Sequence, residues 1–102
     1  MRVIAVDPGY DRLGVAVVEY VDSKEHLVFS GCIETNSEQT LNERLRFLGD
    51  RFQELLHTHS PDTLGIETIF FNNNQKTGIG VAPARGIILY LAQINNCVVY
   101  EF

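Results

Sequence analysis

The chain has little cysteine, little proline, no tryptophan and no long hydrophobic run. Of its 102 residues, three are Pro and two are Cys, at positions 32 and 97. Neither Cys32 nor Cys97 has a second Cys or His at ligand spacing, which excludes a zinc ribbon or a CxxC redox motif. No apolar run approaches the roughly 20 residues that span a bilayer, and Asp7 and Pro8 interrupt the N-terminal run where a signal peptide needs apolar residues. We therefore expect a cytoplasmic protein with no membrane segment.

Basic residues are also scarce. Eight Lys and Arg stand against thirteen Asp and Glu, a formal net charge of −5. Domains that bind nucleic acid by electrostatics alone are usually basic, so a nucleic-acid function would need help from metal ions or from further chain. The chain is 45% apolar, and at this length a domain buries roughly two thirds of its unfolded surface. Residues 1–102 are thus expected to form one globular domain.

The apolar pattern begins with three strands. Short β-branched runs at residues 2–7, 13–20 and 26–35 have short connections, which predicts an antiparallel meander. A helix follows, since apolar residues recur at steps of four and three, and Thr40 with Glu43 has the spacing of a capping box. The apolar positions of this helix are Leu41, Leu45, Leu48, Phe52 and Leu55.

The second half of the chain adds two strands and one helix. Residues 63–71 predict a fourth strand, the segment from about 77 to 94 a second helix, and residues 97–102 a fifth strand. A strand, helix and strand in succession form a right-handed parallel connection in nearly all cases, so the fourth strand is expected in the same sheet. The order βββαβαβ indicates an α/β fold. Because such sheets are usually covered on both faces, we expect the domain to be incomplete at its C-terminus.

Two acidic residues are candidates for chemistry. Asp7 could simply cap the turn at Pro8, and Glu67 could face water on an edge strand. If the first and fourth strands are parallel neighbours, however, both acids emerge at the same carboxyl edge, with the strands about 4.8 Å apart. Ligands bind at this edge in open α/β sheets. Because close carboxylates repel, a hard cation such as Mg²⁺ or Mn²⁺ is expected between them, and it would suit phosphoryl transfer.

Three segments together resemble the RuvC family of Holliday junction resolvases. They are RVIAVDPGYDRLGVAVVE, IETIFFNNNQKT and VAPARG, and they follow the family's order and similar spacing. The resemblance implies a ribonuclease H-like mixed five-stranded sheet and Mg²⁺-dependent cleavage of symmetric strands at four-way DNA junctions, in recombination and repair. It also implies a homodimer packed through the second helix and, as a further partner, a branch-migration helicase complex. Asp7 and Glu67 resemble the first two of the family's four catalytic acids.

The resemblance also implies residues that contact DNA. Phe70 would lie by the junction, where an unpaired base could stack on it; the alternative is a core position. Lys76, beside the polar loop that contains Asn72, is a candidate phosphate contact. Arg85 and, more weakly, Arg12 are further candidates; the alternative for each basic residue is a solvated or helix-surface charge.

The chain departs from the family pattern in three places. The remaining two acids of the family lie on a helix after the fifth strand, and this chain ends before them. Leu13 stands where the family generally has Thr before Gly14. Ala82 and Pro83 stand where Gly-Gln is usual, and a proline inside the second helix is expected to kink it and so alter the dimer geometry.

Two other classes of function stay open at this stage. The segment DRLGVAVVE is similar to the first hairpin of actin-like ATPases and of YqgF nucleases, which suggests a nucleotide-binding module. The absence of a Gly-rich phosphate loop before a helix N-terminus, and the block IETIFFNNNQKT, speak against it. The third class is a non-catalytic dimerisation domain with vestigial acids. Divalent-ion binding separates this class from a nuclease.

Overall fold

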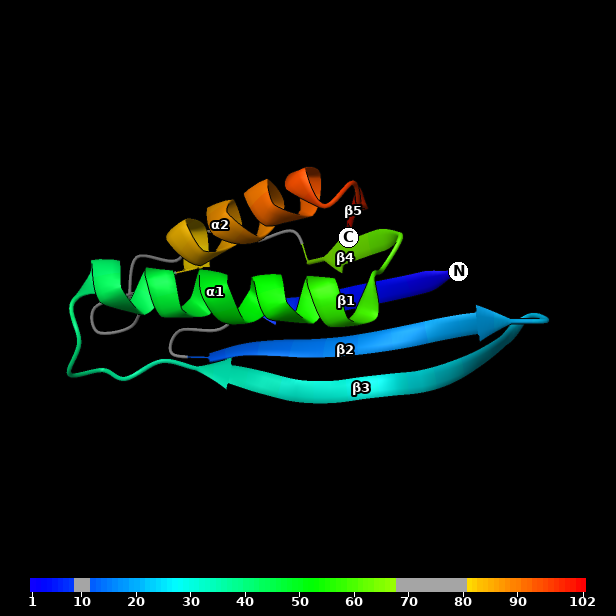
Figure 1. Cartoon of the computed structure of the whole chain (residues 1–102), viewed down its shortest axis with the longest axis horizontal. Coiled ribbons are helices and arrows are strands. Elements are labelled where there is room, and N and C mark those ends of the chain that lie inside the picture. The colour runs from blue at the N-terminus through cyan, green and yellow to red at the C-terminus, as the bar shows by residue number, and fades with distance from the viewer. Residues whose placement is uncertain (9–11, 68–80) are drawn as a thin grey trace.

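The computed structural model describes residues 1–8, 12–67 and 81–102, and shows a five-stranded sheet with two helices on one face (Figure 1). The strands are β1 (Arg2–Pro8), β2 (Arg12–Val21), β3 (Lys24–Glu34), β4 (Thr63–Ile66) and β5 (Val98–Glu101), and the helices are α1 (Leu41–His59) and α2 (Val81–Ile94). The spatial order is β3-β2-β1-β4-β5. The strand β2 is antiparallel to both neighbours, while β1, β4 and β5 run parallel. The predicted α/β order and mixed sheet are confirmed.

The hairpin between β2 and β3 is longer than its sequence suggested. Asp22 and Ser23 both have positive φ, 52° and 64°. Two central residues of this kind form a tight turn whose twist matches that of the flanking strands. Pairing therefore continues up to Val21 and Lys24, through the polar stretch that sequence patterns had assigned to a connection.

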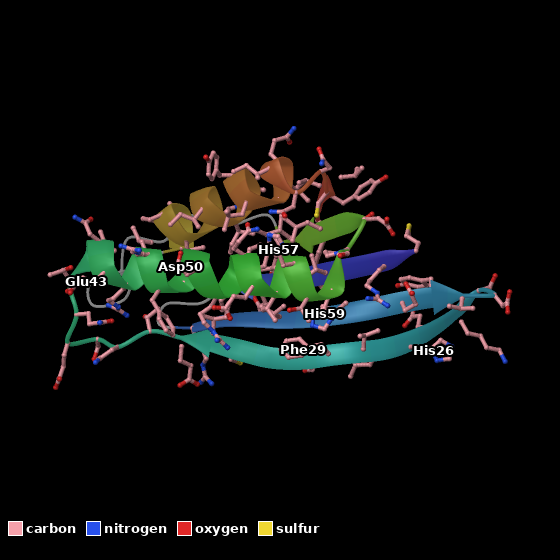
Figure 2. The ribbon with its side chains drawn as sticks, in the orientation of Figure 1. His26, Phe29, Glu43, Asp50, His57 and His59 are labelled. Atoms are coloured by element: carbon pink, nitrogen blue, oxygen red, sulfur yellow. The ribbon has the colours of Figure 1, made fainter. Side chains whose placement is uncertain are left out.

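Helix α1 has the N-terminal cap that its sequence predicted. The backbone N–H of Glu43 donates to Thr40 Oγ1 at 3.2 Å, and the Thr40 N–H donates to Glu43 Oε1 at 2.9 Å. The last helical residue is His59. The cap residue Ser60 donates its N–H to the Leu56 carbonyl, and its left-handed backbone turns the chain out of the helix. Figure 2 shows Glu43 at the start of the helix and His59 at its end, beside β2 and β3.

The core lies between the sheet and the two helices. Its fully buried side chains include Phe52 of α1, Ile88 of α2, Ile4 of β1 and Leu64 of β4. A side chain this deep contributes about 1.5–3 kcal/mol through removal of apolar surface from water. No helix in the described part of the chain is long and apolar enough to cross a membrane.

One sequence-based expectation about the second half needs correction. The strand predicted over residues 63–71 ends at Ile66, so Glu67 is the first residue after β4 rather than a residue within it. Residues 68–71, and the predicted start of the second helix at residue 77, lie outside the described residues. Pro83 is the third residue of α2, in the first turn. The residues before Val81 lie outside the described part of the chain, and the expected effect of Pro83 on this helix stays a prediction.

Candidate functional site

Asp7 and Glu67 meet at the carboxyl edge of the parallel strands. The last paired residues of β1 and β4 are Val6 and Ile66, which are buried in the core on the helix side. Because side chains alternate along a strand, the next residues, Asp7 and Glu67, point to the face of the sheet away from the helices. Both are exposed. The strands at this point are about 4.8 Å apart, so the two carboxylates belong to one site.

The two acids line one concave surface, with a volume of about 500 Å³. Its floor consists of small side chains from the middle of the sheet. Gly14 is the register partner of Asp7, and a Cβ added there would lie 3.6 Å from the Asp7 Cβ. The wall includes the ring of Phe102, the residue after β5. The lining residues are Ala5, Val6, Asp7, Gly14, Val15, Ala16, Ser30, Gly31, Cys32, Glu67 and Phe102.

The donor set of this pocket suits a hard divalent cation. Carboxylate oxygens are the ligands that Mg²⁺ and Mn²⁺ prefer. Among residues 1–8, 12–67 and 81–102, no Lys, Arg or His forms an ion pair with Asp7 or Glu67. The same residues contain no group of three His, Cys, Asp or Glu able to hold a metal ion. The described site therefore offers two carboxylates, and a cation would take its other ligands from water, from a phosphate or from further acids.

The structure separates the other predicted site residues. Arg12 begins β2, and its side chain is 68% exposed with Nη1 3.9 Å from Glu34 Oε1. An exposed pair at this distance contributes little and leaves the guanidinium able to reach another anion. Arg85 is instead held by Glu101 at 2.8 Å. Three predicted DNA contacts lie outside the described residues: Phe70, Asn72 and Lys76.

Sequence reasoning missed Phe102 and Cys32 as parts of the site surface. Phe102 follows β5, and its N–H donates to the Ile66 carbonyl at 3.0 Å, which places the residue beside Glu67. Cys32 is the register partner of Gly14, two strands away from Asp7. The two positions are far from Asp7 in the sequence, so only the strand order and register bring them to this pocket.

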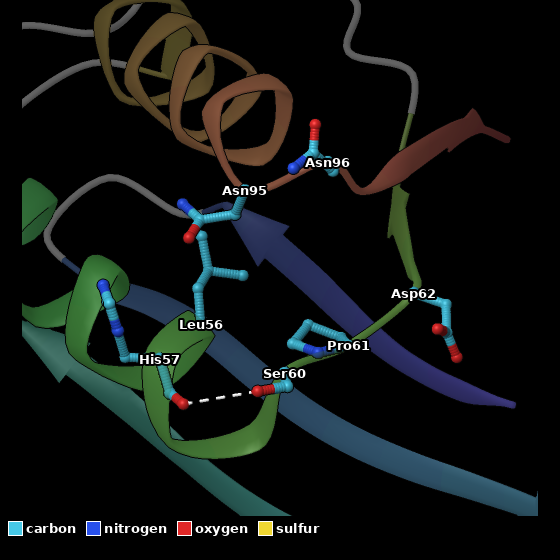
Figure 3. Close-up of a pocket in the computed structure, with 7 residues that line it drawn as sticks. All are labelled: Leu56, His57, Ser60, Pro61, Asp62, Asn95 and Asn96. Carbon is cyan, nitrogen blue, oxygen red and sulfur yellow. Dashed lines mark hydrogen bonds between the residues drawn. The ribbon is translucent and has the colours of Figure 1, made fainter.

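A second concave surface lies at the opposite end of the sheet, where α1 and α2 end (Figure 3). It has a volume of about 280 Å³. Two of its polar groups already have partners: the Asn95 amide donates to the Leu91 carbonyl at 2.8 Å, and the Asp62 carboxylate accepts from the Arg2 N–H at 2.9 Å. The lining residues are Leu56, His57, Ser60, Pro61, Asp62, Asn95 and Asn96.

The chain is similar to proteins of one family along nearly its whole length. The family model described as crossover junction endodeoxyribonuclease RuvC matches residues 3–102. RuvC of Brachyspira hyodysenteriae is 39% identical over 102 residues, which are the whole of this chain and 64% of that protein. RuvC of Thermosipho melanesiensis is also 39% identical, with 65% of its length covered. The chain thus spans slightly less than two thirds of these relatives.

Solved structures agree with the sequence relatives. A Thermus thermophilus RuvC structure superposes with a TM-score of 0.86 at 28% identity, over all of this chain and 63% of that one. The yeast mitochondrial Holliday junction resolvase Ydc2 (TM-score 0.66) and an exopolyphosphatase from Cytophaga hutchinsonii (TM-score 0.56), each 12% identical, share the fold alone. The ribonuclease H-like fold expected from the sequence is confirmed. Since one fold hosts different activities, the function has to be argued from the site.

Proposed function

Because this chain belongs to the RuvC family of crossover junction endodeoxyribonucleases, we propose that it supplies the first two catalytic acids of a nuclease that cuts four-way DNA junctions. The observation that carries the proposal is the placement of Asp7 and Glu67 side by side at the carboxyl edge of the sheet. One of the solved relatives is Thermus thermophilus RuvC in complex with Holliday junction substrate (TM-score 0.85, 27% identity). The expected reaction is cleavage of symmetric strands in recombination and repair.

Nucleases of the RuvC family depend on a metal ion. Mg²⁺, or Mn²⁺ in its place, would be held by Asp7 and Glu67 and would supply Lewis-acid activation of a phosphate and of water. The exposure of both carboxylates leaves room for a DNA backbone to approach them. The small floor at Gly14 keeps side chains from filling the space beside Asp7.

Several residues would place the DNA relative to the acids. The exposed guanidinium of Arg12 can neutralise a backbone phosphate. Phe70, Asn72 and Lys76 follow Glu67 closely in the sequence and are proposed as contacts to the junction. Arg85 is less suited to a phosphate contact, since Glu101 occupies its guanidinium.

The whole assembly is proposed to be a cytoplasmic homodimer packed through α2, with a branch-migration helicase complex as a further partner. Tyr90 and Ile94 of α2 support the dimer surface, because they are apolar and 65% and 53% exposed. Residues 1–102 would act as a single domain completed by further sequence, in keeping with the 64% of the Brachyspira relative that the chain spans. Such completion would also provide the further acids that a two-metal site requires.

A chimera tests the proposed function. Residues 1–102 of this chain would replace the matching segment of the Brachyspira hyodysenteriae relative, and the product would be assayed with Mg²⁺ and a labelled synthetic four-way junction. We expect paired symmetric nicks, and none from the same chimera with Asp7→Asn. A folded chimera that binds the junction without cutting it would favour the non-catalytic dimerisation domain. Tight nucleotide binding without junction binding would favour the nucleotide-binding module.

A further inference from the structure

Arg85 and Glu101 join α2 to the end of β5. Arg85 Nη2 lies 2.8 Å from Glu101 Oε1, and the two side chains are 21% and 49% exposed. The Nε of Arg85 is buried, with no hydrogen-bond partner among the described residues. This guanidinium is therefore oriented by one carboxylate. Removing that carboxylate would leave the guanidinium, whose Nε is buried, without a charged partner among the described residues.

The ion pair lies next to the candidate metal site but on the other face of the sheet. Glu101 is the register partner of Ile66, the last residue of β4. Its side chain shares the face of Ile66, towards α2, whereas the following residue, Phe102, points to the face of Glu67. Phe102 and Glu67 both line the pocket that contains Asp7.

One covalent and hydrogen-bonded path leads from the ion pair to Glu67. Glu101 is followed by Phe102, whose N–H donates to the carbonyl of Ile66 at 3.0 Å, and Ile66 is followed by Glu67. The ring of Phe102 also covers Gly65, since a Cβ added there would lie 3.6 Å from a ring carbon. The end of β5 thus supports the backbone that presents Glu67.

This end of β5 needs a tether. The strand has four residues and lies at the edge of the sheet. Short edge segments open locally with a much lower free energy than the core. The ion pair between Arg85 of α2, a helix packed into the core, and Glu101, the residue before Phe102, opposes such opening.

We propose that Arg85 is a positioning residue for the metal site: through Glu101 it fixes the end of β5 and so the place of Glu67 and Phe102. The inference rests on the proposed function of Asp7 and Glu67 as metal ligands. In this role Arg85 affects metal binding in the absence of DNA. A residue that only contacts a DNA phosphate would have no such effect.

The test uses the 102-residue chain, Mn²⁺ titration without DNA, and hydrogen exchange of the Phe102 amide. Arg85→Ala is expected to weaken Mn²⁺ binding about three- to tenfold and to speed exchange at Phe102. The charge-swapped double variant Arg85→Glu with Glu101→Arg is expected to restore both. Ile88→Val is the matched control, because it destabilises the same helix through the core and keeps the ion pair. It should leave Mn²⁺ affinity unchanged.

Three results would overturn the inference: wild-type Mn²⁺ affinity in Arg85→Ala, no recovery in the swapped variant, or an equal loss in Ile88→Val. The proposed metal site fails in a different way: either the wild-type chain does not bind Mn²⁺, or Asp7→Asn binds it as tightly as the wild type. In that case exchange at Phe102 alone decides whether Arg85 holds the end of β5, and unchanged exchange in Arg85→Ala refutes it.

Discussion

Asp7 in β1 and Glu67, the first residue after β4, lie side by side, each one residue past the last pair that the two parallel strands form. The two residues of that last pair, Val6 and Ile66, are buried under the helices. Two carboxylates held side by side repel each other, and a hard cation between them offsets the repulsion. The proposed metal site follows from this relationship.

Removing either carboxylate should weaken metal binding. We expect Asp7→Asn and Glu67→Gln each to raise the Kd for Mn²⁺ by about tenfold or more, since each deletes one anionic oxygen ligand. Isothermal titration or the Mn²⁺ EPR signal measures this. Glu34→Gln is the control, because it makes the same change in net charge at an exposed acid outside the pocket. Unchanged affinity in both site variants would refute the metal site.

The 102-residue chain by itself should not cut four-way junctions. Two carboxylates can hold one metal loosely, whereas positioning an attacking water and a leaving oxygen requires further ligands. The net charge of −5 also leaves little attraction to phosphate. In a gel-shift and nuclease assay with Mg²⁺, we expect weak junction binding that is lost as salt rises, and no specific nick. Symmetric nicking by this chain would contradict the prediction.

The capping box of α1 should make stability depend on acid. Backbone and side-chain hydrogen bonds from Thr40 lower the pKa of Glu43 from its ordinary value of 4.5. A carboxylate whose pKa is lowered by folding stabilises the native state above its ordinary pKa, and this contribution disappears as pH falls through the lower, folded value. Urea unfolding between pH 5 and about pH 3, a window chosen around the usual Glu pKa, should show less pH dependence for Glu43→Gln than for the wild type. Glu38→Gln, outside the cap, should keep the wild-type slope.

The two thiols should differ widely in reactivity. Cys32 is exposed, whereas Cys97 is buried and its Sγ donates to the Pro61 carbonyl at 3.4 Å. Burial, with a smaller effect of the Asp62 carboxylate, raises the pKa of Cys97, so little thiolate forms at neutral pH. With a thiol reagent we expect Cys32 to react first and Cys97 only as the protein unfolds. Equal rates in the wild type, or rapid labelling of Cys32→Ser, would contradict the burial of Cys97.

One aromatic residue of α1 should carry much of the contact between helix and sheet. Phe52 is fully buried, and Phe52→Ala is expected to lower the free energy of unfolding by about 3–5 kcal/mol because it leaves a cavity. Phe47 is on the same helix and 44% exposed. Phe47→Ala should therefore change stability by no more than about 0.5 kcal/mol in the same urea titration. Similar losses in both would show that α1 is packed differently.

Local patterns in the sequence predicted the elements and the two acids. The spacing of Leu45, Leu48 and Phe52 predicted α1, and Thr40 with Glu43 predicted its cap, because these features depend on residues three or four apart. Asp7 was found because it ends an apolar run, and Glu67 because it is a charged residue within the apolar segment 63–71. The strand–helix–strand order predicted one edge for both, if the first and fourth strands are parallel neighbours. These inferences need only short-range periodicity and the handedness of the connection.

Tertiary structure alone decided how strand ends and helix ends meet. Nothing near Phe102 or Cys32 in the sequence marks them as neighbours of Asp7; strand order and register bring them there. From the sequence, Arg85 could be interpreted as a surface charge or as a DNA contact. The packing of α2 against β5 instead gives it Glu101 as a partner. Such contacts join residues that are distant in the chain. The free energy of each contact depends on how deeply its side chains are buried, and burial cannot be read from neighbouring residues in the sequence.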